Sequence, residues 1–152
     1  METRIATRED TESLVRVRRA FRTDLCAHSD EEHESLDAQF RAYLPVKIDS
    51  GQFVGVLGEE GVDLVCAGFL LVEECPATRE VPTGRLGKVI NVYTYPQHRR
   101  QGHATQILGR IIAVARAMGL DALDLEATTT GRSVYEQAGF SVRGFAPMRL
   151  VL

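Results

Sequence analysis

The sequence lacks the features that would direct it into a membrane, into secretion or onto a nucleic acid. No apolar run approaches the ~20 residues that a membrane-spanning helix needs. The start, Met1–Arg4, leads into no apolar signal region. The formal net charge is −3, so no basic excess is present to neutralise a phosphate backbone. We therefore expect a cytoplasmic protein with neither a membrane partner nor a nucleic-acid partner.

Cysteines are few and follow no pattern. The three cysteines, Cys26, Cys66 and Cys75, are odd in number and do not have the spacing of a metal site. We expect them to be reduced thiols rather than members of a disulfide framework. No metal site is predicted.

The length and composition are those of one folded domain spanning residues 1–152. Hydrophobic residues make up 44% of the chain and charged residues 26%, with no low-complexity tract. A domain of this size buries roughly 70% of the surface that its unfolded chain exposes. The chain is therefore long enough to form a substantial core.

The first third of the chain predicts a short strand and two helices. Residues 4–7 form the strand, and Asp10 or Thr11 caps the first helix. One face of that helix carries apolar residues three and four positions apart, namely Leu14, Val17, Phe21 and Leu25. The second helix is expected to begin near Ser29 and to end before Pro45, because the residue before a proline disfavours helical backbone angles.

The middle of the chain is rich in β-branched and aromatic residues. Residues 53–57 and 62–72 read as a hairpin joined by residues 58–61. A polar loop with two prolines follows at 74–84, and its length marks it as mobile or functional. The next strand, 88–95, stops at Pro96.

The last part of the chain alternates helices and strands. The predicted elements are a helix at 104–118, a strand at 122–127, a short helix at 132–138 and closing strands at 142–145 and 148–152. Gly119 is a natural stop for the longer helix. Alternation of this kind predicts parallel neighbours, whereas the earlier hairpin is antiparallel. The expected fold is α/β, with a central mixed sheet flanked by helices.

The turn Pro96–Ala104 carries the strongest chemical signal. A strand that turns directly into a helix presents unpaired backbone N–H groups at the positive end of the helix dipole. Gly102 allows close approach of a ligand, and Arg99 and Arg100 add charged donors. The segment is neither a P-loop nor a dinucleotide-binding fingerprint. Read alone, it is either a diphosphate site or a strand-to-helix turn with two solvated arginines.

Two motifs in this order resemble those of the GNAT acyltransferase superfamily. Arg99-x-x-Gly102-x-Ala104 resembles its signature Arg/Gln-x-x-Gly-x-Gly/Ala, and Ser133–Phe140 resembles its Leu-Tyr-Glu-Lys-Leu-Gly-Phe. Leu125–Thr128 followed by Gly131-Arg132 is similar to a branch with His-Ala-Thr or His-Ala-Ser in this strand. The resemblance covers nearly the whole chain and is to small single-domain members of the bacterial type.

The resemblance implies an acetyl-CoA site. Backbone amides of residues 101–105 would hold the pyrophosphate, and the preceding strand would splay from its parallel neighbour to leave main-chain groups for the pantetheine arm. Thr128 falls where many relatives carry a cofactor-contacting Asn. The implied cofactor residues are Tyr93, Thr94, Tyr95, Arg99, Arg100, Gln101, Gly102, His103, Ala104, Thr105 and Thr128.

Two residues are implied in catalysis. Tyr135 matches the usual general acid of the family, which protonates the departing thiolate. The attacking amine must lose a proton, and Glu126 is the first candidate for the base, although it replaces the His of the similar branch. The alternatives for the base are Glu73, Glu74, His98, His103 and water relays.

The expected activity is N-acyl transfer from acetyl-CoA to a primary amine, by direct attack in a ternary complex and without a metal. The amine belongs to a small molecule or a protein, and Glu73, Glu74, Glu126 and the acidic stretch 31–34 point weakly to a cationic acceptor. A non-catalytic acyl-CoA sensor or interaction module is the alternative, and an unrelated nucleotide-phosphate binder is a third reading. A homodimer is compatible with the resemblance, and the sequence does not decide it.

Overall fold

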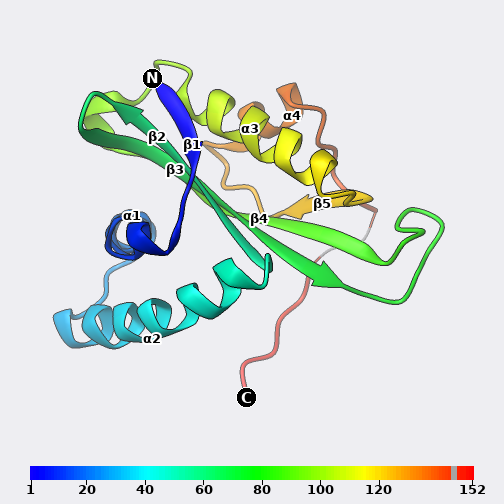
Figure 1. The fold of residues 1–152 in the computed structure, drawn as a ribbon, viewed down its shortest axis with the longest axis horizontal. Helices are drawn as coiled ribbons and strands as arrows, with labels where there is room; N and C mark the ends of the chain where they lie inside the picture. The colour runs from blue at the N-terminus through cyan, green and yellow to red at the C-terminus, as the bar shows by residue number, and fades with distance from the viewer. Residues whose placement is uncertain (145–146) are drawn as a thin grey trace.

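The computed structural model describes residues 1–144 and 147–152, and its centre is a five-stranded mixed sheet (Figure 1). The strands are β1 (Glu2–Ile5), β2 (Phe53–Glu60), β3 (Asp63–Glu74), β4 (Arg85–Thr94) and β5 (Ala122–Leu125). They lie in the order β1-β2-β3-β4-β5. The first three pairings are antiparallel and the β4–β5 pairing is parallel. The predicted mixed sheet is confirmed.

Helices cover both faces of this sheet. They are η1 (Arg8–Asp10), α1 (Thr11–Leu25), α2 (Asp30–Asp49), η2 (Pro96–His98), α3 (His103–Ala117) and α4 (Arg132–Gln137). Figure 1 shows α1 and α2 on one side of the sheet and α3 and α4 on the other. No helix in the described part of the chain combines the length and the apolarity that crossing a membrane requires.

Each face of the sheet has its own hydrophobic cluster. On the α1–α2 side, Leu14 and Leu44 are fully buried against Phe69. On the α3 side, Ile107 and Ile111 pack on β3. A Cβ on Gly68 of β3 would lie 2.7 Å from Ile107 and 2.8 Å from Ile111, so glycine is what allows α3 to approach this closely.

The β2–β3 turn is tighter than predicted. Residues 58–60, expected in the turn, belong to β2, and the turn consists of Gly61 and Val62. Gly61 has a φ of +62°, which favours glycine. The register shifts at Gly58/Glu59, as in a β-bulge. These features set the direction of Glu60 at the end of β2.

The second helix does not end before Pro45, and that prediction is wrong. It starts as expected after Ser29, whose hydroxyl accepts the Glu32 N–H at 3.2 Å, but it continues to Asp49. A proline inside a helix costs about 3 kcal/mol. Here the residues on both sides of it gain burial, because Leu44 is fully buried and Ile48 packs on the same cluster. Tertiary packing therefore overrides the local preference.

The two closing strands are also wrong for the residues that the structure describes. Residues 142–144 and 147–152 form no strand, and Val142, Met148 and Leu150 are exposed. Phe145, the last residue of the first predicted strand, lies outside the described residues. Strand preference depends on a partner, and Pro147 has no N–H to give to a sheet. The β-branched residues after α4 therefore do not add a further strand beside β5, which stays at the edge of the sheet.

A buried carboxylate joins the two helices on the first face. Asp37 is 6% exposed and accepts hydrogen bonds from Arg19 Nε at 2.6 Å and Arg22 Nη2 at 2.5 Å. Burial pushes its pKa upward, but the hydrogen bonds from Arg22 and Arg19 outweigh burial and hold the pKa below its ordinary value. The Arg22 side chain is itself largely buried. Loss of Asp37 would therefore leave the buried Arg22 guanidinium without a negative partner.

We expect Asp37→Ala to lower the free energy of unfolding by about 3 kcal/mol, as for removal of one partner of a buried ion pair. Urea denaturation at pH 7 measures this change. Because the folded pKa is depressed, this part of the stability is present above pH ~4 and is lost as the pH falls through the folded pKa. Glu34→Ala, on an exposed position of the same helix, is the control and should stay within about 0.5 kcal/mol. Equal losses in both variants would contradict the assignment.

Candidate functional site

The loop between β4 and α3 has an unusual backbone. It leaves η2 at Arg99 and enters α3 at His103, and two of its residues adopt left-handed angles, Arg100 with φ +61° and Gly102 with φ +80°. A Cβ on Gly102 would meet no atom within 4 Å. The backbone angle, and not crowding, therefore selects glycine here.

The first turn of α3 has no side-chain cap. Gly102 is the N-cap residue, and its carbonyl accepts the Gln106 N–H at 3.1 Å. The N–H groups of residues 103–105 precede Gln106, the first residue whose N–H donates within the helix, and they point along the helix axis. Gln101, Gly102 and Thr105 are exposed. These groups together form the positive end of a fifteen-residue helix at the protein surface, which suits an anion.

Strand β4 extends beyond its pairing with β5 just before this loop. The two strands pair only from Leu86 to Val89, while β4 continues to Thr94. Asn91 has a left-handed φ of +51°, and the β3–β4 register shifts opposite it. A bulge bends and twists its strand. All four residues of β5 take part in the pairing, so the second half of β4 has no β5 partner, and the divergence expected from the resemblance stays a prediction.

Two main-chain groups expected to be free at this divergence are paired. The Tyr95 N–H donates to Val65 O at 3.1 Å, and Thr94 O accepts from Arg99 Nε at 3.0 Å. The Thr94 hydroxyl, in contrast, is buried without a hydrogen-bond partner in the described part of the chain. Tyr93 is buried, with its ring 5.3 Å from that of Tyr95. The free polar groups at the end of β4 are thus fewer than the sequence suggested.

Arg99 points toward α1 and not toward the first turn of α3. Its guanidinium pairs with Asp24 and lies 5.6 Å from the centre of the Tyr93 ring. The hydrogen bond with Asp24 raises the Arg99 pKa. The side chain therefore ties the loop to α1, which differs from its expected place beside a pyrophosphate. Arg100 is exposed on the loop.

Tyr135 and Glu126 line the same pocket. It has a volume of about 850 Å³ and lies between β5, α4 and the residues after α4. Tyr135 packs against Phe140, with ring centres 6.2 Å apart, and burial raises its pKa. Glu126 follows the end of β5, is exposed, and pairs with Lys88 Nζ at 3.3 Å. The two residues predicted to be catalytic are thus brought together.

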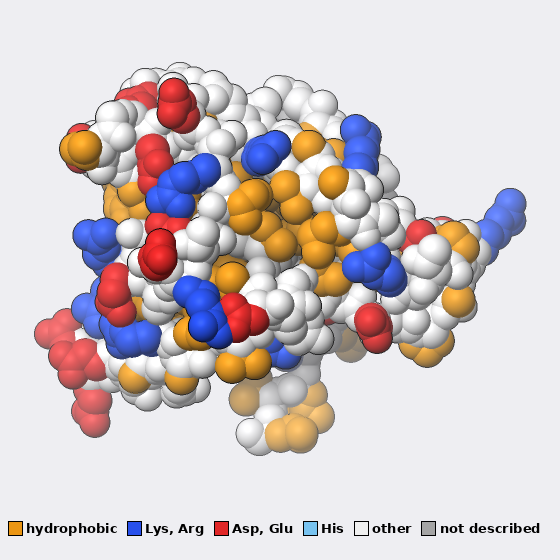
Figure 2. Space-filling view, viewed as in Figure 1, with side chains coloured by type: hydrophobic (Ala, Val, Ile, Leu, Met, Phe, Trp, Pro, Cys, Tyr) orange, Lys and Arg blue, Asp and Glu red, His pale blue; other side chains and the backbone are white. Residues whose placement is uncertain are grey.

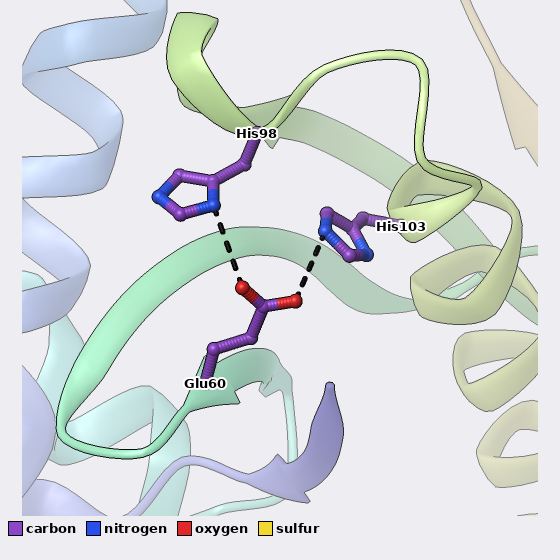
Figure 3. Close-up of side chains that lie close together, drawn as sticks. All are labelled: Glu60, His98 and His103. Carbon is purple, nitrogen blue, oxygen red and sulfur yellow. Dashed lines mark ion pairs between the residues drawn. The ribbon is translucent and has the colours of Figure 1, made fainter.

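The alternative bases are divided between two places. Glu73 also lines the Tyr135 pocket, and Glu74, the last residue of β3, lies opposite Arg85 in the β3–β4 register. His98 and His103, which flank the loop between η2 and α3, instead approach Glu60 (Figure 3). Glu126 and Glu73 thus share a pocket with Tyr135, whereas the two histidines do not line it, and the identity of the base stays a prediction.

Thr128 organises the turn into α4. Its hydroxyl accepts the Gly131 N–H at 3.2 Å, and its carbonyl accepts the N–H groups of Gly131 and Arg132. The exposed hydroxyl thus already has a role within the chain, and its contact with a cofactor stays a prediction.

Asn91 is a buried polar residue of β4, near this loop, that the sequence reasoning missed. It is 7% exposed, and its Oδ1 accepts from Arg18 Nη1 at 2.8 Å. One signal could have found it. Asn91 is a polar residue within an apolar strand, and asparagine is enriched among non-glycine residues with left-handed angles.

The surface in Figure 2 has a hydrophobic area near its middle. Lys and Arg side chains lie around this area, and acidic side chains gather at the lower left, over the start of α2. The charges are therefore unevenly distributed on this face, although the chain carries only a small net charge.

Comparison with known proteins finds acetyltransferases among those similar to this chain. The family model described as the acetyltransferase (GNAT) family matches residues 14–140. A predicted acetyltransferase from Clostridium acetobutylicum, solved with acetyl-CoA, is 26% identical with a TM-score of 0.86, covering 97% of this chain and 95% of that chain. A GCN5-related N-acetyltransferase from Ralstonia eutropha JMP134 is 25% identical with a TM-score of 0.85, covering 98% and 97%.

A curated relative matches part of the chain. The amino-acid acetyltransferase of Edwardsiella ictaluri is 36% identical over 88 residues, which are 54% of this chain and 19% of that protein. The chain therefore matches only about a fifth of that relative's length.

Proposed function

Because the chain belongs to the acetyltransferase (GNAT) family, we propose that it transfers an acetyl group from acetyl-CoA to a primary amine, by direct attack in a ternary complex. The observation that carries the proposal is the uncapped first turn of α3 after left-handed Gly102, placed after the part of β4 that extends beyond its pairing with β5. An anion site next to the part of β4 that has no β5 partner suits a ligand with a pyrophosphate and an extended arm.

The cofactor would bind in two parts. The N–H groups of residues 101–105 would hold the pyrophosphate, and the arm would enter between β4 and β5. The buried Thr94 hydroxyl, which has no partner in residues 1–144 and 147–152, is available to the arm. Arg99 would hold the loop against α1 through its ion pair with Asp24. Arg100 is exposed and would be able to reach a phosphate.

The chemistry assigns a proton-transfer role to each catalytic residue. Glu126 accepts a proton from the acceptor ammonium, directly or through water, because an amine with a pKa of ~10.4 is charged at neutral pH. The freed nitrogen attacks the thioester carbon, forming a C–N bond and a tetrahedral oxyanion. The attacking nitrogen then carries a positive charge. As the C–S bond breaks, the Tyr135 hydroxyl gives its proton to the thiolate. The second proton of the nitrogen passes through water to the Tyr135 phenolate, which leaves a neutral amide, and Glu126 releases its proton to solvent. Burial raises the Tyr135 pKa, which keeps the hydroxyl proton in place beforehand.

A cationic acceptor fits the charges of the pocket. Three of its carboxylates are paired, Glu126 with Lys88, Glu136 with Arg132 and Asp124 with Arg143. Glu73 lines the same pocket and has no ion pair among the described residues. We assign Glu73 to the recognition of the acceptor's positive charge before attack.

Acetyl-CoA binding is the first test. At a concentration 100 times its Kd, acetyl-CoA should stabilise the native chain by about 2.7 kcal/mol. For a domain of this size that is a rise in Tm of roughly 5–10 °C. No rise with any acyl-CoA would rule out both the enzyme and a non-catalytic acyl-CoA-binding module.

Turnover is the second test. Thiol release from acetyl-CoA, measured with a panel of primary amines, should exceed release without an amine. Binding without release from any amine in the panel would favour the non-catalytic module, which the intact Tyr135 argues against.

A further inference from the structure

Three metal-ligating side chains converge at the junction of β2, η2 and α3. Glu60 ends β2, His98 lies in η2 and His103 opens α3 (Figure 3). Glu60 Oε2 is 3.6 Å from His98 Nδ1, and Glu60 Oε1 is 3.4 Å from His103 Nε2. The three ligand atoms lie within 4.8 Å of one another. The cluster contains residues that are far apart in sequence.

His103 provides a second, independent observation. It is 5% exposed, and neither of its ring nitrogens has a hydrogen-bond partner among the described residues. Its Nε2 approaches Glu60 without the alignment of a hydrogen bond. A buried polar group without a partner is costly, and native structures contain few of them. The ring points toward the Glu60 carboxylate, where a ligand would satisfy it.

The distances suit a small ion between the three groups. Bonds of ~2.0–2.2 Å from zinc to nitrogen and oxygen place neighbouring ligands of a tetrahedral site roughly 3.3–3.5 Å apart. The two measured separations, 3.4 and 3.6 Å, are close to this value. Two imidazoles and one carboxylate suit zinc and its neighbours, whereas calcium and magnesium prefer oxygen ligands.

We propose that Glu60, His98 and His103 bind a divalent transition-metal ion, with Zn²⁺ as the reference ion and one coordination position left open. The ligands are the carboxylate of Glu60, Nδ1 of His98 and Nε2 of His103. Although the positive end of α3 disfavours a cation, the charge of Glu60 offsets it. The ion would link the β2–β3 hairpin to the start of α3. This binding is separate from acyl transfer and would add a site that the cysteine spacing does not predict.

The test is Zn²⁺ titration of the full chain after removal of metals by EDTA. Isothermal titration should show one equivalent bound by the native protein. Glu60→Gln keeps the size of the side chain but removes its charge, and His98→Asn removes a partly exposed ligand. Loss of even an outer-shell partner typically costs about 10- to 100-fold in metal affinity. Each variant should therefore bind Zn²⁺ at least about tenfold more weakly.

His28→Asn is the matched control. The His28 ring lies 5.1 Å from that of His33 and beside Cys26, so this position also brings imidazole and thiol side chains together. This variant should keep the affinity of the native protein. The proposal is overturned if the native protein binds no Zn²⁺, if Glu60→Gln and His98→Asn bind as tightly as it does, or if the loss occurs in His28→Asn instead.

A second set of measurements distinguishes loss of metal binding from loss of folding in the variants. Far-ultraviolet circular dichroism reports whether each variant keeps its helices. Zn²⁺ should raise the Tm of the native protein, because it binds only the folded site, and should raise the Tm of His98→Asn by less. Equal Tm shifts in both proteins would place the ion elsewhere and contradict the assignment.

Discussion

Replacing Gly102 with valine should weaken acetyl-CoA binding by more than 100-fold while the sheet and its cores stay folded. Gly102 has a φ of +80°, and a β-branched residue at such an angle costs about 1–3 kcal/mol of strain. Relief of that strain moves the loop, and the N–H groups at the start of α3 lose their common direction. Charged hydrogen bonds contribute about 1.5–3 kcal/mol each, so loss of two of them exceeds 100-fold in Kd.

Gly109→Ala is the matched control for this prediction. Gly109 lies inside α3, and a Cβ there also meets no atom within 4 Å, but its backbone is helical. Alanine should therefore stabilise the helix by about 0.5–1 kcal/mol and leave acetyl-CoA affinity unchanged. Isothermal titration with acetyl-CoA and thermal unfolding of both variants provide the comparison. Native affinity in Gly102→Val would refute the assignment of this turn to the cofactor.

The elements that the sequence predicted well depend on neighbouring residues. The apolar stripe containing Ile107 and Ile111 defined α3 within one residue of each end, because helical periodicity is a local property. Gly102 was recognised for the same reason, since it lies between a strand and a strongly amphipathic helix. Ser29 marked the start of α2 through a capping interaction that spans three residues.

The errors arise where distant parts of the chain decide the outcome. The helix continues past Pro45 because Leu44 and Ile48 reach a core formed by other elements. Residues 142–144 have strand-like composition, but a strand requires a partner that composition does not supply. An interpretation based only on neighbouring residues could not predict either result.

The polar contacts of the site also depend on residues that are distant in sequence. Arg99 pairs with Asp24, which lies 75 positions away, and thereby leaves the place expected for it beside the first turn of α3. The Glu60, His98 and His103 cluster depends on how the hairpin turn at Gly61 meets the β4–α3 loop. The sequence placed the loop correctly between a strand and a helix, but the roles of its side chains came from the resemblance. Their directions come from tertiary contacts that no motif contains.

Replacing Tyr135 with phenylalanine should lower kcat by about 100-fold, at the lower end of the range for a general acid. The lower end applies because a thiol with a pKa of ~8.5 is already a fair leaving group. The ring still packs on Phe140, so the Kd for acetyl-CoA should change less than twofold. Steady-state thiol release and titration of acetyl-CoA measure the two quantities separately.

The pH dependence distinguishes an acid from a packing residue at this position. Burial raises the Tyr135 pKa, so the phenol keeps its proton throughout the neutral range and the native rate should not decline because of it until the pH exceeds ~10. Tyr43→Phe, on α2 at the opposite face of the sheet, should leave kcat unchanged. If Tyr135→Phe also retains the native kcat, the thiolate leaves without an acid, and the raised pKa of Tyr135 reflects only its burial against Phe140.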